Sequence, residues 1–319
     1  MGLVAGKTFF VTGGAGFVGS NMCELLIKKG AKVIVYDNLS NGKREFIKHL
    51  EGNGLSFIQA DLLDLQSIEA AMSGKRIDAV IHLAANSDIS QSMKKTDVDL
   101  NQGTIATYNT LEAARKNGVK DVLFSSSSVV YGVANVLPTP ENYGPLRPIS
   151  LYGASKLAAE GLITSFSHLF KMNYYIFRFA NVVGRNSTHG VSLDFKRKLE
   201  KNPGELEVLG DGKQRKSYID VEDLTNAMLQ IYENSRESEN IFNLSTDDQI
   251  TVEEIAKMVI AKVSPNAGIR YTGGSQGWPG DVPNQFLSNK KMRDFGIELK
   301  RKTSRECVAN VIGLLTENR

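Results

Sequence analysis

The chain has 319 residues, of which 41% are hydrophobic and 23% are charged. This composition excludes a disordered chain, a collagen-like chain and a disulfide scaffold, and the length predicts two domains or one large domain with a cap. Lys and Arg exceed Asp and Glu by 38 − 35 = 3. That excess is too small for a dedicated nucleic-acid binder, so no nucleic-acid partner is expected.

The two cysteines, Cys23 and Cys307, lie far apart in the sequence and outside any CxxC spacing. We therefore predict neither a disulfide framework nor a metal site, and expect two buried, reduced thiols. The N-terminal residues lack the charged and apolar regions of a secretory signal. The longest apolar runs are far shorter than the ~20 residues of a membrane span. These features predict a cytoplasmic protein with no membrane partner.

The first half of the chain alternates short apolar runs with longer amphipathic segments. Strands are expected at residues 7–12, 32–36, 55–59, 79–83, 121–125 and 174–178. Helices are expected at 17–29, 64–72 and 151–170, and over a long segment that ends near 117–118, with Gly30 after the first helix and Asp64 as an N-cap. Alternation of this kind predicts an α/β fold, a Rossmann-type doubly wound parallel sheet.

After about residue 181, short strands and glycine turns replace the regular alternation. Helices are expected at 221–233, 252–262 and 304–315, and residues 240–244 as a strand that returns to the main sheet. The cation-rich segments 196–201 and 300–305 are expected to be solvated faces. We therefore predict a Rossmann domain over residues 1–180, with a returning segment near 217–246, and a smaller mixed C-terminal substrate domain over residues 181–319.

A glycine-rich turn directly follows the first predicted strand. The sequence TGGAGFVGS at residues 12–20 places GxGxxG between a strand and a helix, as in dinucleotide-binding loops. Gly14 is expected to permit the tight turn, Gly16 to let a pyrophosphate approach the backbone, and Gly19 to let helix and strand pack closely. The pyrophosphate would rest on the helix N-terminus, where free N–H groups and the dipole attract anions.

Asp37 ends the second predicted strand, 18 residues after Gly19. A carboxylate at this place can hold the ribose hydroxyls of adenosine and would repel a 2′-phosphate. The sequence therefore predicts NAD as the cofactor. Lys43 and Arg44, which follow closely, are the one feature that points toward NADP.

Tyr152 and Lys156 lie four residues apart on a predicted helix, so the phenol and the ammonium share one face. Serines 125–128 follow the fifth predicted strand, at the edge where an open α/β sheet binds ligands. A free tyrosine is ionised to only about one part in a thousand at neutral pH. A lysine cation and a positive nicotinamide ring would favour the phenolate, which would make Tyr152 a base for a sugar or alcohol hydroxyl.

In this order along the chain, these motifs resemble those of the extended short-chain dehydrogenases/reductases, and among them the nucleotide-sugar 4-epimerases such as UDP-glucose 4-epimerases. The resemblance covers nearly the whole chain and implies NAD as cofactor, a UDP-sugar as substrate, and a homodimer built on two long helices at about 91–117 and 152–170. It rests on TGGAGFVGS, on YDNLSNG at 36–42, HLAA at 82–85, FSSSSVVYG at 124–132, YGASK at 152–156 and RFANVVG at 178–184.

The resemblance also implies roles for single residues. Ser127, 25 residues before Tyr152, would hydrogen-bond the sugar 4-oxygen and complete a catalytic set with Tyr152 and Lys156. The expected NAD contacts, besides Tyr152 and Lys156, are Gly13, Gly16, Phe17, Val18, Gly19, Asp37, Asn38, Asp61, Leu62, Leu83, Ala84, Ala85 and Asn101. The expected substrate contacts, besides Ser127, are Asn181, Arg215, Tyr218 and Asp281.

Several of these positions have a structural alternative. Asn101 could cap or bridge helices, Asn181 could satisfy the backbone at a strand end, and Arg215 could form a surface ion pair. No catalytic role is assigned to His82, which is expected to be buried and hydrogen-bonded, or to His189, which is expected in a loop.

Two positions depart from the family pattern. Trp278 stands in the stretch where many members carry a diphosphate-binding arginine, so either Arg270 supplies that charge or Trp278 packs beside the uracil. Ser87 stands where some epimerases have a lysine, so the identity of the sugar in the substrate stays open.

The residues before Val130-Tyr131-Gly132 narrow the reaction. Related dehydratases and decarboxylases place acidic residues there, whereas this chain has Ser128 and Val129. We therefore predict an isomerase that epimerises C4 of a UDP-sugar, first of all UDP-glucose/UDP-galactose, through a transient 4-keto sugar. The alternatives are a 4-epimerase of UDP-glucuronate or a UDP-N-acetylhexosamine, an NAD-dependent nucleotide-sugar 4-reductase, and a non-catalytic NAD-sensing protein.

Overall fold

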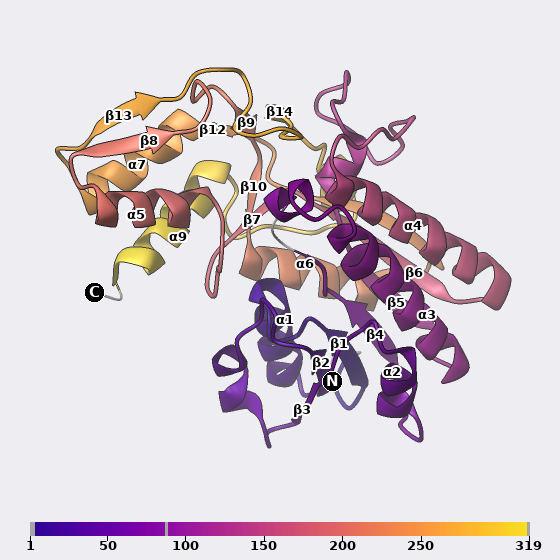
Figure 1. Cartoon of the computed structure of the whole chain (residues 1–319). Coiled ribbons are helices and arrows are strands. Elements are labelled where there is room, and N and C mark those ends of the chain that lie inside the picture. The colour runs from indigo at the N-terminus through magenta and orange to yellow at the C-terminus, as the bar shows by residue number, and fades with distance from the viewer. Residues whose placement is uncertain (1–3, 87–88, 318–319) are drawn as a thin grey trace. The chain divides into compact units, whose positions relative to one another are not determined.

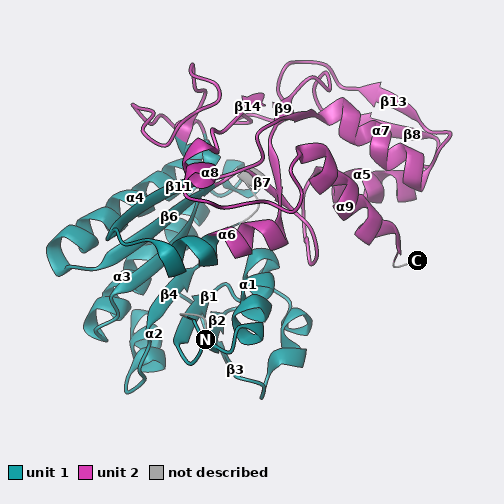
Figure 2. Ribbon diagram, turned by 180° about the vertical axis from the view of Figure 1, so that it is seen from behind, with its two compact units in different colours: residues 1–130, 150–178, 228–242 teal, residues 131–149, 179–227, 243–319 magenta. Residues whose placement is uncertain are grey.

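The computed structural model describes residues 4–86 and 89–317 and divides into two compact units. Unit 1 consists of residues 1–130, 150–178 and 228–242, and unit 2 of residues 131–149, 179–227 and 243–319 (Figure 2). Residues 131–149 thus group with unit 2, although they lie in the sequence between Ser127 and Tyr152. Ser87, which stands where some related epimerases have a lysine, lies outside the described residues.

Unit 1 is built on a seven-stranded sheet with the order β11-β6-β5-β4-β1-β2-β3 (Figure 1). The pairs β1–β2, β1–β4, β2–β3 and β4–β5 are parallel. The predicted Rossmann-type fold is confirmed, including the return of the last strand to the main sheet. The strands are β1 (Thr8–Thr12), β2 (Lys32–Asp37), β3 (Leu55–Gln59), β4 (Ala79–His82), β5 (Asp121–Ser127), β6 (Asn173–Phe179) and β11 (Glu239–Leu244).

Two predicted local signals lie at the ends of helices in unit 1. Gly30 follows α1 with φ +81°, and the Asp64 side chain accepts the Ser67 N–H at the start of α2. One apolar cluster joins the faces of α2, α3 and α4 to the sheet through residues such as Met72, Leu111 and Ile163. The elements are α1 (Phe17–Lys28), α2 (Leu65–Met72), α3 (Ala106–Lys116) and α4 (Leu151–Phe170), with short turns at η1 (Arg44–Phe46), η2 (Lys48–Leu50), η3 (Ile89–Met93) and η5 (Ser128–Tyr131).

The segment before α3 is not the regular helix that the sequence predicts. It is a π-helical stretch, η4 (Leu100–Ile105), which packs against α4. Gly103 permits this close approach, because a Cβ there would lie 2.4 Å from the Ser155 Oγ. A π-turn changes which side chains face the neighbouring helix, and such turns are frequent at functional sites.

Unit 2 has its own core, formed by α5, α7 and α9 against β8 through residues such as Leu199, Leu206, Val259 and Val311. Its strands form small mixed sheets, as the fold prediction expected. β7 (Asn181–Val183) pairs with β10 (Tyr218–Asp220), β8 (Glu205–Val208) pairs with β13 (Gly268–Tyr271), and β9 (Arg215–Lys216) lies between β12 (Ile250–Thr251) and β14 (Asn284–Gln285). The helices are α5 (Val191–Lys201), α7 (Val252–Val263), α8 (Lys290–Asp294) and α9 (Ser304–Glu317), and α6 (Val221–Asn234) continues from unit 2 into unit 1.

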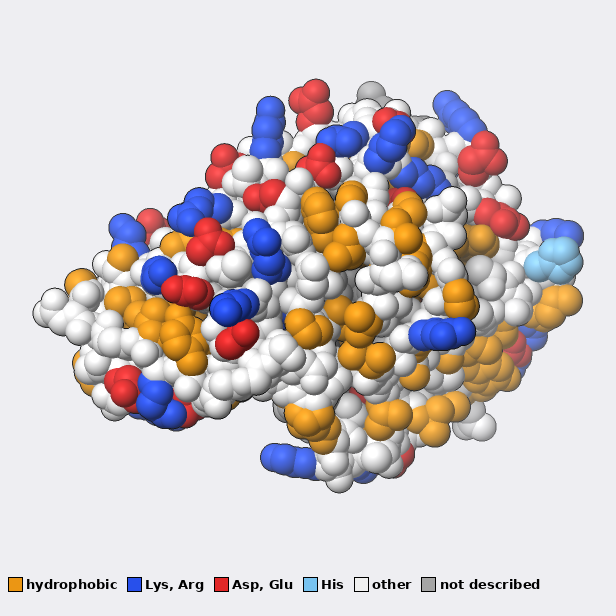
Figure 3. Space-filling model, turned by 90° about the horizontal axis from the view of Figure 1, so that it is seen from above, with side chains coloured by type: hydrophobic (Ala, Val, Ile, Leu, Met, Phe, Trp, Pro, Cys, Tyr) orange, Lys and Arg blue, Asp and Glu red, His pale blue; other side chains and the backbone are white. Residues whose placement is uncertain are grey.

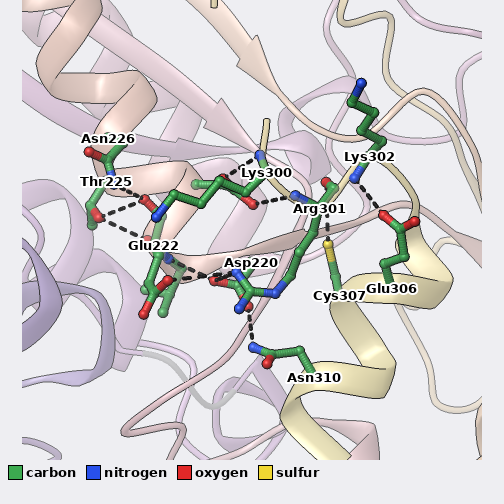
Figure 4. A network of polar contacts seen from close by, with 12 residues as sticks. Asp220, Glu222, Thr225, Asn226, Lys300, Arg301, Lys302, Glu306, Cys307 and Asn310 are labelled. Atoms are coloured by element: carbon green, nitrogen blue, oxygen red, sulfur yellow. Dashed lines mark hydrogen bonds and ion pairs between the residues drawn. The ribbon is translucent and has the colours of Figure 1, made fainter. Parts of the chain in front are cut away.

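A buried carboxylate anchors the loop before α9 (Figure 4). Asp220 accepts a hydrogen bond from Asn310 of α9 (2.8 Å) and pairs with Arg301 (3.3 Å). In the first turn of α6, Asp223 accepts the backbone N–H groups of Lys300 (2.8 Å) and Arg301 (3.1 Å). Burial raises the pKa of Asp220 despite these partners. The network ties β10, α6 and α9 together within unit 2. It also gives two residues of the cation-rich segment 300–305, Lys300 and Arg301, a structural role.

Cys23 and Cys307 are both buried and free, as expected. Across residues 4–86 and 89–317, no helix is long and apolar enough to cross a membrane. Within the same part of the chain, no three His, Cys, Asp or Glu side chains gather as a metal site would require. Figure 3 shows a face on which Lys and Arg are interspersed with Asp and Glu.

Candidate active site

The turn between β1 and α1 depends on three glycines. Gly13 has φ +68°, and a Cβ there would lie 2.7 Å from the Ala84 nitrogen. The left-handed residue of the turn is therefore Gly13, and the prediction that Gly14 has this role is wrong. Gly14 instead packs on β2, since its Cβ would lie 2.7 Å from the Val35 side chain. Gly19 faces the Gly13 carbonyl oxygen, which would lie 2.0 Å from a Cβ, so helix and strand pack closely there.

The start of α1 and the end of β2 fit a dinucleotide. Gly16 is the N-cap of α1, and no side chain caps that end. Its first N–H groups can therefore bind a phosphate. The Asp37 carboxylate is buried at the end of β2, where it accepts the N–H groups of Ala15 (3.0 Å) and Leu39 (2.8 Å). Burial raises its pKa, while these two hydrogen bonds lower it.

The other expected cofactor contacts of unit 1 gather at the same edge of the sheet, with Asn101 as the exception. The Asn38 amide donates to the Asp61 carboxylate (2.9 Å), which joins the ends of β2 and β3. Leu62 is buried in the core, and its carbonyl accepts from Asn109 (2.8 Å). Phe17 and Val18 form the first turn of α1, and Leu83, Ala84 and Ala85 follow β4 as half-buried residues.

The structure brings Ser127, Tyr152 and Lys156 together. Ser127 is the last residue of β5, and Tyr152 and Lys156 lie in the first turns of α4. The Lys156 Nζ donates to the Ser125 carbonyl (2.6 Å) and lies 5.7 Å from the centre of the Tyr152 ring. The Ser127 hydroxyl is near enough to the Tyr152 phenol to lower the pKa of the phenol. A lysine, a phenol and a hydroxyl thus form one cluster at the carboxyl end of β5.

Burial dominates the proton affinities of this cluster. It raises the pKa of Tyr152 to about 12, with a further increase from Asp99 and a decrease from the Ser127 hydrogen bond. Burial lowers the pKa of Lys156 to about 7, against the charges of Asp99 and Glu160. Burial therefore works against the expected phenolate, and Tyr152 keeps its proton at neutral pH. Lys156 loses its proton more readily than an exposed lysine.

A buried ion pair lies one turn beyond Lys156. Arg178 of β6 donates from Nη2 and Nε to the Glu160 carboxylate at 2.7 and 3.0 Å, and Ser126 donates to it at 2.5 Å. The side chains of Arg178 and Glu160 are only 4% and 7% exposed. The pair joins α4 to β5 and β6, which fixes the position of the lysine.

His82 is buried on the other side of the lysine, as expected for a structural histidine. Its Nδ1 lies 2.7 Å from the Thr12 hydroxyl and its Nε2 3.0 Å from the Thr107 hydroxyl. Because the Thr107 hydroxyl donates to the Gly103 carbonyl (2.5 Å), it accepts from Nε2–H, and Nδ1 accepts from Thr12. Burial, helped by the Lys156 charge, lowers the pKa of His82 to about 3.

Asn101 and Asp99 lie at the start of η4 and differ in what they contact. The Asn101 amide donates to Asp97 on its own segment (3.3 Å), in line with the structural alternative for this residue. Asp99 is 1% exposed and acts on both Tyr152 and Lys156. Sequence reasoning missed Asp99, although a carboxylate between the apolar Val98 and Leu100 was a signal.

In unit 2, two of the predicted substrate contacts lie apart from any charged cluster. The Asn181 amide donates to the Ser217 carbonyl (3.1 Å) and to Gln285 (3.4 Å), which satisfies the end of a strand. The Arg215 side chain is exposed. Arg270, the alternative diphosphate cation, is exposed as well and pairs with Glu205 and Glu207 at 2.8 and 2.6 Å.

The other two predicted contacts belong to what we call the Lys216 cluster, formed by Lys216, Tyr218, Trp278 and Asp281. The buried Asp281 pairs with Lys216 (2.5 Å) and accepts the Gly277 N–H (3.1 Å). The Lys216 Nζ lies 5.1 Å from the centre of the Trp278 ring. Burial and the Asp281 charge raise the pKa of Tyr218. Sequence reasoning missed Lys216. Side chains alternate along extended chain, which would have put positions 216 and 218 on one side.

Comparison with known proteins agrees with this geometry. Residues 9–245 match the model of the NAD dependent epimerase/dehydratase family. The chain is 30% identical to the UDP-glucose 4-epimerase of Bacillus subtilis over 321 residues, which cover 93% of this chain and 94% of the relative.

Two solved structures are similar over nearly the whole chain. The UDP-glucose 4-epimerase of Thermotoga maritima with UDP-glucose is 30% identical with a TM-score of 0.88, covering 98% of this chain and 99% of that one. The UDP-glucose 4-epimerase of Thermus thermophilus in complex with NAD is 30% identical with a TM-score of 0.85, covering 96% and 98%. The sheet order, the glycine turn and these matches show that the chain belongs to the NAD-dependent epimerase/dehydratase family.

Proposed function

We propose that this protein is an NAD-dependent 4-epimerase of a UDP-sugar, with UDP-glucose and UDP-galactose as the first candidates. The observation that carries the proposal is the cluster of Ser127, Tyr152 and Lys156 in a unit that also has a dinucleotide loop. Ser128 and Val129 cannot supply the acid or base that elimination requires. The names and ligands of the similar proteins support the same reaction.

Unit 1 would bind the cofactor and unit 2 the nucleotide of the substrate. Gly13, Gly16 and the start of α1 would hold the pyrophosphate. Asp37 and Asn38 would hold the adenosine ribose, and Asp61 the adenine. The buried Asp37 carboxylate would repel a 2′-phosphate, which favours NAD over NADP. When bound, NAD supplies the electron acceptor and donor for C4 of the sugar.

Tyr152 would carry the proton of the reaction. Ionised beside a charged Lys156, the Tyr152 phenolate would take the proton of the C4 hydroxyl as that carbon is oxidised, and would return it to the 4-oxygen after the 4-keto sugar has rotated. Ser127 would hydrogen-bond the 4-oxygen in both steps. Lys156, held by the Ser125 carbonyl, supplies positive charge that opposes the effect of burial on the phenol. The proton and the electrons taken from the sugar are both returned, so the cycle needs no further reactant.

The Lys216 cluster would bind the UDP moiety. We assign the diphosphate to Lys216 in preference to Arg215, because Lys216 is the cation that lies beside Asp281 and Trp278. Asp281 would lie near the uridine ribose and Trp278 beside the uracil.

A homodimer would form through helices of unit 1. Large apolar side chains are exposed along η4, α3 and α4, which supports this assembly: Leu100, Ile105, Tyr108, Leu151, Leu169 and Phe170.

Proton NMR tests the proposal directly. The purified protein is mixed separately with UDP-galactose, UDP-N-acetylgalactosamine and UDP-glucuronate, with no NAD added. We expect the C4 epimer to appear in at least one tube, since an epimerase regenerates its cofactor at every turnover. A 4-reductase would instead require added reduced cofactor. Absence of an epimer from all three tubes, also after NAD is supplied, would overturn the proposal.

A further inference from the structure

One buried carboxylate of the site has no role in the mechanism above. Asp99 precedes η4 and is 1% exposed. Its Oδ1 accepts a hydrogen bond from the Asn86 amide (3.1 Å), which fixes the group. Its Oδ2 has no hydrogen-bond partner among the described residues. A buried polar atom without a partner destabilises a fold, so its presence calls for a functional explanation.

The packing of η4 against α4 holds Asp99 in this place. Gly103 lets the two segments meet at Ser155, the residue before Lys156. The Gly103 carbonyl is bonded through Thr107 to His82, so η4 is also tied to β4. Asp99 is therefore positioned by backbone and buried side chains, and small movements of a surface loop would not displace it.

The charged and titratable groups around Lys156 differ in whether a counter-ion balances their charge. Among residues 4–86 and 89–317, the charged and titratable groups that interact with Lys156 are Tyr152 and Glu160 on α4, His82 on β4 and Asp99. Glu160 is paired with Arg178, and His82 is neutral because burial keeps its pKa near 3. No ion pair to Asp99 is formed within the part of the chain that the structure describes, so its charge acts on the Tyr152–Lys156 pair without being balanced by a counter-ion there.

We propose that Asp99 is a positioning residue of the active site, which acts on the Tyr152–Lys156 pair through the charge of its buried carboxylate, held there by the packing of η4 against α4. The inference rests on the proposed function. A negative charge opposes the loss of a proton from either group, and in this protein Asp99 raises the pKa of both Tyr152 and Lys156. It keeps Lys156 cationic in a site whose burial favours the neutral amine.

The substitution Asp99→Asn separates charge from shape. Removing the negative charge lowers the proton affinity of both groups, so both limbs of the pH–activity profile should move to lower pH. At about pH 8 activity should fall about tenfold for each unit by which the basic limb moves. Asp97→Asn is the matched control, because Asp97 lies two residues away, is exposed and bonds Asn101. Its profile should equal that of the wild type.

A second readout does not depend on turnover. The near-ultraviolet absorbance of tyrosinate is titrated in the wild type and in Asp99→Asn, each with and without Tyr152→Phe, so that the difference reports Tyr152 alone. Its ionisation should begin at lower pH in Asp99→Asn. Asp99→Ser, a smaller uncharged variant, should shift the titration the same way and serves if Asp99→Asn folds poorly.

The outcomes separate this inference from the proposed function. A wild type without epimerase activity would contradict the proposed function, while the absorbance titration would still test Asp99. An active wild type with limbs that stay in place in Asp99→Asn, or that move apart, would overturn the role of Asp99. A change in activity at all pH values alike would likewise indicate packing alone.

Discussion

The two units each contain a lysine beside a tyrosine and a carboxylate, but the two lysines are held in different ways. In unit 1, Lys156 is buried and its ammonium is anchored by a neutral backbone carbonyl. In unit 2, Lys216 is 14% exposed and forms a direct ion pair with Asp281. The first arrangement brings a cation to the point of losing its proton, which suits proton transfer. The second keeps a cation beside its counter-ion, which suits exchange of one anion for another on binding.

The largest effect should come from the unit 1 cluster. Tyr152→Phe removes the only group that we assign to the C4 proton, so epimerisation should slow by about 10²–10⁴-fold. The rate is measured by the NMR assay with the preferred UDP-sugar. Tyr271→Phe, on an exposed tyrosine of unit 2, is the control. Activity of Tyr152→Phe within tenfold of the wild type would contradict the assignment.

The second prediction compares a buried ion pair of unit 1 with an exposed one of unit 2. Glu160→Gln leaves the buried Arg178 charge without a counter-ion, so the free energy of unfolding should fall by about 3–5 kcal/mol. Glu205→Gln removes one of the two carboxylates from the exposed Arg270 and should change the free energy of unfolding far less. Urea unfolding measures both, and equal losses would show that burial does not distinguish the pairs.

The third prediction concerns His82 and acid. Its pKa is about 3 in the folded protein, below the ordinary value of 6.5. Its contribution to stability is therefore complete above about pH 6.5 and is lost as the pH falls toward 3. By about pH 4 the loss should reach about 3 kcal/mol. His82→Gln should lack this part of the pH dependence, whereas His189→Gln, on an exposed loop, should keep it. Parallel stability curves for wild type and His82→Gln would disprove this role.

The smallest effect should come from the Lys216 cluster. A charge-assisted hydrogen bond contributes about 1.5–3 kcal/mol, so Lys216→Gln should weaken UDP binding by about 10–100-fold. Arg215→Gln, on the adjacent exposed residue, should change binding only slightly. Isothermal titration calorimetry with UDP measures both. The reverse order of effects would return the phosphate contact to Arg215.

What could be predicted from the sequence follows from how local each feature is. The glycine turn, Asp37 at a strand end, and Tyr152 and Lys156 one helical turn apart are properties of short segments. Asp99 depends on a π-turn that forms where Gly103 meets Ser155, a contact between residues about 50 positions apart, which helical periodicity cannot show. Lys216 lies in the two-residue strand β9, and pairing with β12 and β14 determines which side of the sheet each of its residues occupies. Helix α5 was not predicted, because the cationic residues at 196–201 obscure its apolar pattern. Phe195 and Leu199 are nevertheless buried at helical spacing.

The division of the chain has a consequence for modularity. Unit 1 is assembled from three separate stretches, and its last stretch, 228–242, includes most of the edge strand β11. A chain cut anywhere between β6 and residue 228 would lose that strand and expose the backbone of β6. An exposed strand edge pairs with other chains, so such a fragment should aggregate. In this chain, unit 1 therefore cannot be exchanged as one continuous block, and an exchange of unit 1 must carry all three stretches together.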